Sequence, residues 1–331
     1  MYAMSETTTR RLGAGGPAVA PIGLGCIGMT GFYGPVDEAE ALRTLRRALD
    51  LGCTFWDSSD AYGPYTNELL LSRVLRTRRD EAFVTTKFGV TIDPRTLARS
   101  VDGRPEHVRR SCDASLRRLG VDHIDLYYQH RVDPAVPIEE TVGAMAELVR
   151  DGKVRHLGLS EPGPTTVRRA HAVHPLAAVQ TEYSLWSRDA ERDLLPVLRE
   201  LGIALVAYAP IGHGFLTGGV RSRDDLAAID FRRAQPRFAE DNLRANLDLL
   251  AVLEEVATER CATPAQVAIA WTLHAGPATI PIPGSSRVAH LEENLAAAHL
   301  ELGDADLARL ERLAAPRGQR YDPAGMRTVG L

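Results

Sequence analysis

Eight short apolar runs alternate with longer amphipathic segments along most of the chain, and this order is the feature that most restricts its fold. Most of the runs are nearly continuous in apolar residues, as is typical of strands that are covered on both faces. Parallel strands joined by helical crossovers are the structure that such an alternation predicts. The predicted strands are 22–26, 53–57, 82–87, 124–129, 154–159, 178–180, 203–208 and 279–282.

The segments between these runs have recognisable helix ends. Thr263, Pro264 and Gln266 match the cap, the first helical position and the capping partner of a helix. Gly120 and Gly202 end helical patterns just before a strand. Eight strand-helix units in 331 residues fit a closed barrel, which takes about 250 residues plus additions. We therefore predict an α/β protein, a (β/α)8 TIM barrel that forms a single domain over residues 1–331.

Three additions to this barrel are expected. A hairpin precedes it within about residues 1–20, mainly between Arg10 and Ala20. The connection after the seventh strand, residues 210–239, combines glycines with phenylalanines and is typical of a lid. A C-terminal extension, residues 303–331, begins with a short helical pattern and then loses periodicity, so its last residues are expected to be mobile.

Composition excludes several classes of partner. The 39 Lys and Arg against 43 Asp and Glu give a net charge of -4 without a basic stripe, so nucleic acid is not expected as a partner. The four cysteines lack the spacing of a zinc site or of a disulfide framework, which predicts no metal and a reducing cytoplasm. Neither a signal peptide nor a membrane span is expected. Assembly into a homo-oligomer stays open.

A glycine-rich motif offers an alternative fold. Gly23, Gly25 and Gly28 spell G-x-G-x-x-G after a strand, and Asp57 ends the next strand, as in the dinucleotide-binding fingerprint of a Rossmann-type NAD dehydrogenase. In that fingerprint the third glycine packs inside a helix that begins at the loop. Here further glycines and a proline precede the next helix, which is expected near Asp37, so a tight turn is the favoured interpretation.

Four polar residues stand at or just after three of the predicted strand ends. Asp57 ends the second strand, Tyr62 lies in the loop after it, Lys87 ends the third strand and His130 follows the fourth. A parallel barrel places the C-terminal ends of all its strands on one face. These four side chains are therefore expected to converge, although they are far apart in the sequence.

This set of groups suits the delivery of a proton to a carbonyl oxygen. A phenol titrates near pH 10, so Tyr62 needs a neighbour that favours its phenolate, and Lys87 is the candidate. Asp57 would keep the lysine charged and placed, because a buried ammonium without a partner tends to lose its proton. The Nε2–H group of His130 would hold the carbonyl oxygen. Separately, an ion pair, a packed phenol and a capping imidazole are ordinary structural features; together they indicate catalysis.

At this point the chain resembles the aldo-keto reductases over nearly all of its length. Asp57, Tyr62, Lys87 and His130 match the family pattern, and the stretches 126–134, 152–161 and 180–186 are similar to the branch that includes YakC-like, pyridoxal and perakine reductases. The resemblance implies NADPH-dependent reduction of an aldehyde or ketone to an alcohol. Hydride would come from the nicotinamide and the proton from Tyr62. NADH is less favoured as the cofactor.

The resemblance also implies where the cofactor binds. Ser160 and Gln180 match contacts of the nicotinamide carboxamide, and Tyr208 matches the ring that stacks on the nicotinamide. The remaining matches, to the pyrophosphate loop and the adenosine end, are Pro210, Gly212, Leu216, Gly218, Pro283, Ser285, Arg287, Glu293 and Asn294. Three positions depart from the pattern, because Glu161 replaces a common Asn, and Ser286 and His290 stand where relatives have cations.

The identity of the substrate is not encoded in any motif. A small-molecule carbonyl compound of apolar or aromatic character is expected, since the predicted rim of the pocket is rich in aromatic residues, although aromatics at loop roots often only pack. The rim residues are Phe32, Tyr33, Trp56, Val90, Trp186 and His213. A regulatory subunit of the potassium-channel β type, which shares this fold and binds a nucleotide, is an alternative function; no channel-docking extension is evident.

Overall fold

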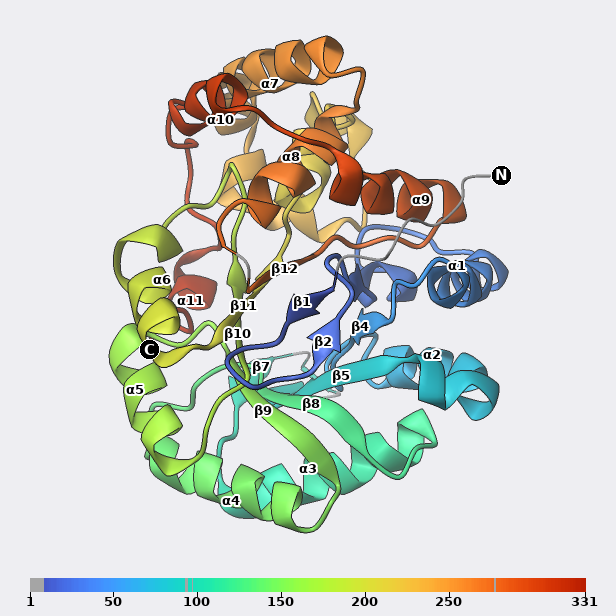
Figure 1. Ribbon diagram of the computed structural model, residues 1–331, viewed down its shortest axis with the longest axis vertical. Coiled ribbons are helices and arrows are strands. Elements are labelled where there is room, and N and C mark those ends of the chain that lie inside the picture. The colour runs from blue at the N-terminus through green and yellow to red at the C-terminus, as the bar shows by residue number, and fades with distance from the viewer. Residues whose placement is uncertain (1–8, 93–94, 97, 277) are drawn as a thin grey trace.

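The computed structural model describes residues 9–92, 95–96, 98–276 and 278–331. Eight parallel strands follow one another in sequence order around the centre of the molecule (Figure 1). All eight predicted strands are confirmed. They are β3 (Leu24–Gly25), β4 (Phe55–Asp57), β5 (Phe83–Phe88), β8 (Ile124–Gln129), β9 (Val154–Ser160), β10 (Ala178–Glu182), β11 (Ala204–Tyr208) and β12 (Thr279–Ile282).

Glycines close the sheet into a barrel. The amide of Gly23 donates to the carbonyl of Pro281 at 2.9 Å, and the amide of Gly25 donates to that of Pro283 at 3.1 Å, so β3 meets β12. A Cβ atom on Gly25 would lie 2.8 Å from the carbonyl oxygen of Ile282, so this close approach requires glycine. Gly28 lies in a separate 3-10 turn, Ile27–Thr30. The closed barrel in sequence order excludes the Rossmann alternative.

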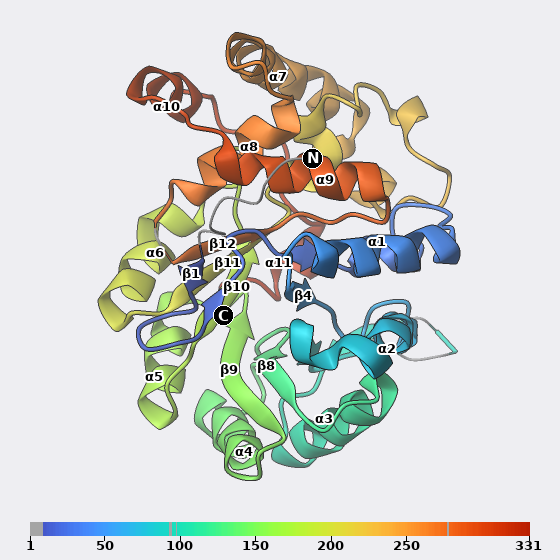
Figure 2. The ribbon, with the colours of Figure 1, turned by 45° about the vertical axis from the view of Figure 1, so that its right-hand side comes forward.

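Helices surround the barrel (Figure 2). The predicted capping box is confirmed, because the Thr263 hydroxyl accepts from the Gln266 amide at 3.2 Å and the Gln266 side chain accepts from the Thr263 amide at 2.9 Å. Gly120 and Gly202 end their helices with φ values of 69° and 66°. The helices are α1 (Glu38–Asp50), α2 (Thr66–Arg78), α3 (Pro105–Leu119), α4 (Ile138–Arg150), α5 (Pro164–Val173), α6 (Ala190–Leu201), α7 (Glu240–Glu259), α8 (Pro264–Leu273), α9 (Val288–Ala296), α10 (Asp304–Glu311) and α11 (Pro323–Met326).

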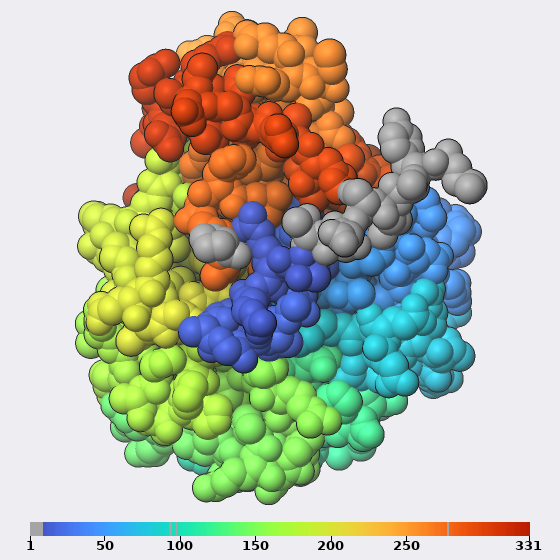
Figure 3. Space-filling view, in the orientation of Figure 1, coloured from blue at the N-terminus to red at the C-terminus, as the bar shows by residue number. Residues whose placement is uncertain are grey.

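The N-terminal hairpin covers one end of the barrel. Strands β1 (Arg10–Arg11) and β2 (Ala18–Val19) pair antiparallel, as predicted. Leu12 and Val19 are buried in one cluster with Phe55 and Val206 of the barrel. Figure 3 shows the hairpin, in dark blue, over the middle of this face. The candidate catalytic residues lie at the opposite, C-terminal ends of the strands.

One connection and the end of the chain differ from expectation. A second hairpin, β6 (Val90–Ile92) and β7 (Arg99–Val101), was not predicted. The end of the chain, expected to be mobile, is instead hydrogen-bonded to the barrel mouth, because Gly330 donates to the carbonyl of Glu161 and Gly163 donates to that of Leu331. Residues 210–239, the predicted lid, form a series of 3-10 turns.

Within the described ranges, no helix has both the length and the apolar character needed to cross a bilayer.

Candidate active site

Lys87 stands at the centre of a buried polar cluster. Its ammonium donates to Asp57 Oδ2 at 2.5 Å, to the carbonyl oxygen of Ser58 at 2.8 Å and to Tyr62 Oη at 3.1 Å. The side chains of Lys87 and Asp57 are 1% and 3% exposed. Parallel pairing of β4 with β5 brings these residues together, so the structure places three of the four predicted groups in direct contact.

The second carboxylate oxygen of Asp57 is also occupied. Oδ1 accepts from the Gln180 amide at 2.7 Å and from the Thr85 hydroxyl at 2.9 Å. A buried carboxylate is costly unless its charge is paired and its lone pairs accept hydrogen bonds. Both conditions are met here, so Asp57 is fixed in position beneath Lys87.

His130 completes the cluster from the end of β8. Its ring lies edge-on to the ring of Tyr62, with centroids 5.9 Å apart and an interplanar angle of 82°. Its Nδ1 atom is 3.1 Å from the hydroxyl of Ser59. All four predicted catalytic residues therefore meet at one mouth of the barrel, as the parallel topology implies.

The phenol of Tyr62 keeps its proton at neutral pH. Burial raises its pKa well above 10, and the Asp57 carboxylate raises it further, whereas the guanidinium of Arg131 lowers it. The sequence predicts that Lys87 lowers this pKa by favouring the phenolate, but burial and the Asp57 carboxylate dominate and the pKa of Tyr62 is raised. Arg131 is thus a charged neighbour of Tyr62 that the sequence analysis did not assign.

Burial also sets the protonation of the two bases. It lowers the pKa of Lys87, and the Asp57 carboxylate partly restores it. Burial and the cations Arg131, Lys87 and Arg99 hold the pKa of His130 well below its usual range. The imidazole is therefore neutral near pH 7 and has a single N–H group.

The predicted carboxamide contacts lie beside this cluster. Ser160 and Gln180 are direct partners in the register of β9 and β10, and Tyr208 lies at the end of β11. Arg131 donates to the Ser160 hydroxyl at 3.3 Å and to the carbonyl of His130 at 2.8 Å. Arg131 therefore bridges the polar cluster around Lys87 and the predicted nicotinamide site.

Glu161 connects the predicted nicotinamide site with the C-terminal segment. It has a left-handed backbone with φ 54°, a conformation that Asn adopts more readily than Glu. Its Oε1 atom accepts from Tyr208 Oη at 2.7 Å and from Arg320 at 3.0 Å, and Tyr208 Oη is 2.6 Å from Tyr321 Oη. Arg320 and Tyr321 were missed because the C-terminal segment has no periodicity or motif to mark them.

The residues predicted to hold the pyrophosphate lie in or next to the turn Gly212–Thr217. Pro210, Gly212 and Leu216 are buried, and Gly218 ends the turn with φ 76°. Three consecutive residues from Gly212 to Gly214 have positive φ values, which are tolerated because two of the three are glycine.

The residues predicted for the adenosine end surround the start of α9. Arg287 is exposed and precedes the helix, and Ser285 accepts from its amide at 3.2 Å. The first helical amide, that of Val288, donates to Glu40 Oε1 at 3.1 Å. Pro283 and Asn294 are buried and Glu293 is half-buried. A carboxylate therefore already occupies the helix N-terminus, where an anionic group is favoured.

The residues predicted for the substrate rim divide into two groups. Phe32 stacks on Phe231 with centroids 4.0 Å apart, and Tyr33 Oη is 3.2 Å from Nδ1 of His213. Val90 is half-buried in β6. Trp56 and Trp186 are buried instead: the Trp56 indole donates to the Cys53 carbonyl at 3.1 Å, and Trp186 stacks on Phe215 with centroids 4.3 Å apart. Phe231, not assigned from the sequence, joins the first group.

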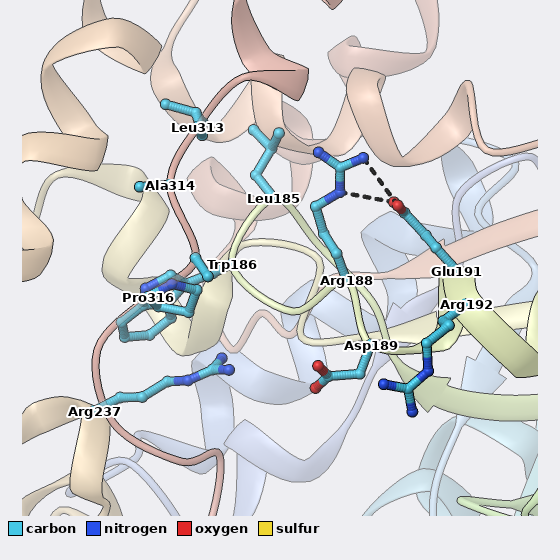
Figure 4. A pocket seen from close by; sticks show the side chains of 11 residues that line it. Leu185, Trp186, Arg188, Asp189, Glu191, Arg192, Arg237, Leu313, Ala314 and Pro316 are labelled. Carbon is cyan, nitrogen blue, oxygen red and sulfur yellow. Dashed lines mark hydrogen bonds and ion pairs between the residues drawn. The ribbon is translucent and has the colours of Figure 1, made fainter.

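A cavity of about 480 Å³ lies between the connection from β10 to α6 and residues 313–316 (Figure 4). Trp186, Arg188 and Arg237 are among its lining residues, and none of the four catalytic candidates lines it. Arg188 is paired with Glu191 at 2.8 Å, and Arg237 donates to the Ser187 hydroxyl at 2.6 Å. Both guanidinium groups already have partners among the protein's own side chains, so we assign no ligand to this cavity.

Known proteins resemble the chain over almost its whole length. The profile of the Aldo/keto reductase family matches residues 21–315. The structure is similar to that of the glycerol dehydrogenase AKR11B4 from Gluconobacter oxydans, with 27% identity, a TM-score of 0.85 and coverage of 96% of this chain and 99% of the other. For a thermostable aldo-keto reductase bound to the inhibitor epalrestat, the identity is 30%, the TM-score 0.74 and the coverage 93% and 100%.

A third similar structure is an aldo/keto reductase from Klebsiella pneumoniae in complex with NADP and acetate. It has 27% identity and a TM-score of 0.74, with 95% of this chain and 98% of that chain covered. The branch suggested by the sequence stays a prediction. The fold, the convergence of Asp57, Tyr62, Lys87 and His130, and the family profile lead to one conclusion: the chain is an oxidoreductase and belongs to the aldo/keto reductase family.

Proposed function

We propose that this protein reduces the carbonyl group of an aldehyde or ketone to an alcohol, with NADPH as the preferred cofactor and Tyr62 as the proton donor. The observation that carries the proposal is the chain of contacts from Asp57 through Lys87 to the phenol of Tyr62, with the last step at 3.1 Å. Membership of the family supports the type of reaction.

The residues at the strand ends fit a nicotinamide by their chemistry. A carboxamide group both donates and accepts hydrogen bonds. Ser160 has a hydroxyl that can do either, and Gln180 has an amide oxygen that can accept, while its NH2 group donates to Asp57. The reduced nicotinamide would supply a hydride to the carbonyl carbon. The NADP in the related Klebsiella pneumoniae structure supports this class of cofactor.

The remaining chemistry belongs to the side chains. Tyr62 holds its proton beside the mouth of the barrel and would transfer it to the carbonyl oxygen as negative charge develops there. Lys87 lies 3.1 Å from the phenol oxygen and would stabilise the phenolate that results. Neutral His130 would fix the same carbonyl oxygen through Nε2–H.

Preference for NADPH over NADH would depend on Arg287. A guanidinium is well suited to a phosphate because it presents paired donors. Arg287 is exposed at the start of α9, next to Ser285 and near Glu40. It would therefore pair with the 2′-phosphate that distinguishes NADPH from NADH.

The substrate class follows from the aromatic group at the mouth. Phe32, Tyr33, His213 and Phe231 form a connected set of ring contacts. Such a surface favours apolar or aromatic carbonyl compounds over small polar ones.

A panel of aliphatic and aromatic aldehydes and ketones, each assayed with NADPH and with NADH, tests the proposal. We expect oxidation of NADPH that depends on the carbonyl compound, fastest with aromatic members and slower with NADH. Turnover would also separate an enzyme from a nucleotide-binding regulatory subunit. A protein that binds NADPH but turns over no member of the panel would contradict the proposed reaction.

A further inference from the structure

The hydroxyl of Ser59 lies between the carboxyl group of Asp60 and the imidazole of His130. Its Oγ atom is 3.1 Å from Nδ1 of His130 and 3.4 Å from Oδ1 of Asp60, and it accepts from the amide of Ala61 at 3.1 Å. Ser59 and Asp60 are 0% and 6% exposed. Ser59 therefore links the carboxyl of Asp60 to the imidazole at the mouth.

The hydrogens carried by Asp60, Ser59 and His130 allow two complete hydrogen-bonding arrangements. Ser59 has one hydrogen, and neutral His130 has one on either nitrogen. If Asp60 is protonated, it donates to Ser59, Ser59 donates to Nδ1, and the imidazole hydrogen is on Nε2. If Asp60 is ionised, Ser59 donates to Asp60 and accepts from Nδ1–H, which leaves Nε2 without a hydrogen.

The surroundings of Asp60 allow both states near neutral pH. Glu68 from α2, Arg118 from α3 and the phenol of Tyr127 from β8 are the ionisable groups near its carboxyl. Glu68 is buried and bonded to Arg118, so its negative charge stays close to Asp60. Burial and the negative charge of Glu68 together raise the pKa of Asp60 to about 7, although Arg118 and the hydrogen bonds from Ser59 and Ala61 act in the opposite direction.

His130 itself does not become charged in this range. The groups that face it are Arg131, Lys87, Arg99 and the ring of Tyr62, and the three cations, together with burial, oppose an imidazolium. A proton gained or lost at Asp60 can therefore change which nitrogen of His130 carries the hydrogen without changing the charge of the ring.

We propose that Asp60, acting through the hydroxyl of Ser59, is a positioning residue that sets the tautomer of His130. With Asp60 protonated, His130 presents Nε2–H to the carbonyl oxygen; with Asp60 ionised, it does not. The consequence for catalysis rests on the proposed function, whereas the tautomer change does not.

The tautomer can be observed directly in the full-length protein. The ¹⁵N signals of the His130 ring, assigned by comparison with His130→Gln, report which nitrogen carries the hydrogen. In the wild type we expect a change from Nε2–H to Nδ1–H between about pH 6 and 8, on either side of the titration of Asp60. In Asp60→Asn, whose amide can donate to Ser59 but cannot ionise, Nε2–H should persist. A wild-type tautomer that stays constant over this range would overturn the proposal.

Activity gives a second readout. As pH rises above about 7, kcat/KM for carbonyl reduction should fall roughly tenfold per pH unit in the wild type and stay level in Asp60→Asn. Ser59→Ala should also abolish this fall above pH 7, because it removes the hydroxyl that connects Asp60 to His130. The matched control is Ser72→Ala, a buried serine of α2 whose hydroxyl donates to the carbonyl of Leu69 at 2.8 Å, which should keep the fall in kcat/KM above pH 7. A fall in kcat/KM above pH 7 that persists in both Asp60→Asn and Ser59→Ala would contradict the positioning role. A wild-type protein without turnover would contradict the proposed function alone.

Discussion

Arg320 donates hydrogen bonds to both carboxylate oxygens of Glu161, at 3.0 and 3.1 Å. The two side chains are separated by 159 positions in the sequence and are 7% and 2% exposed. Because Glu161 also accepts from Tyr208, the C-terminal segment is part of the predicted nicotinamide site.

The first prediction concerns this ion pair. Arg320→Ala leaves the carboxylate of Glu161 buried with one cation fewer, which should lower the free energy of unfolding by about 3–5 kcal/mol. Urea denaturation measures the change. The control is Arg317→Ala, an exposed arginine of the same segment, which should alter stability by less than about 0.5 kcal/mol. Adding Glu161→Gln to Arg320→Ala should recover part of the loss, and strictly additive effects would show that the pair is not coupled.

The second prediction concerns Arg287. Arg287→Ala removes the cation proposed to pair with the 2′-phosphate, so the Kd for NADPH should rise about tenfold or more while that for NADH changes little. Fluorescence titration with each cofactor measures both constants. An equal rise in the Kd for NADPH and for NADH would contradict the proposed contact with the 2′-phosphate.

Glu40 provides a third prediction at the same site. Its carboxylate accepts from the Val288 amide at 3.1 Å and so competes with an anionic phosphate for the start of α9. Glu40→Gln should tighten NADPH binding about two- to fivefold, the size of a charge effect at a helix terminus. Glu38→Gln is the matched control, since Glu38 lies on the same helix but pairs with Arg73. If Glu40→Gln tightens NADH binding as much as NADPH binding, the assignment of the 2′-phosphate to the start of α9 is wrong.

The fourth prediction is a pH dependence of stability. The pKa of Asp60 is raised from 3.8 to about 7 in the folded protein. As pH rises from about 4 to 7, the unfolded chain loses this proton first, so the Asp60 contribution to the free energy of unfolding falls by up to about 4 kcal/mol. Asp60→Asn should therefore gain stability relative to the wild type between pH 5 and 8, as measured by urea denaturation. A difference between the two proteins that does not vary with pH would contradict the raised pKa.

Much of the site could be predicted because it depends on topology. Asp57, Lys87 and His130 stand at strand ends, and parallel strands place those ends on one face whatever the details of packing. Tyr62 follows in the loop after β4. The apolar runs that mark these strands are readable because a parallel strand is covered on both faces.

The remaining features depend on contacts that the local sequence does not encode. Arg320 and Tyr321 act through residues far away in the chain, and their own segment has no periodicity. The strands of the second hairpin, Val90–Ile92 and Arg99–Val101, have three residues each, too few for an alternating pattern. The sequence also cannot tell an aromatic ring at the mouth, such as Phe32, from a buried one, such as Trp186.

Tyr62 is proposed to donate the proton to the carbonyl oxygen, and Tyr62→Phe separates this role from cofactor binding. This change removes the hydroxyl that lies 3.1 Å from Lys87 and keeps the ring. The measurement is the steady-state loss of NADPH absorbance with the best carbonyl substrate, alongside the Kd for NADPH in the same variant. We predict that carbonyl reduction falls by a factor of about 10² or more while the Kd changes little. Equal rates of reduction in Tyr62→Phe and the wild type would contradict proton donation by Tyr62.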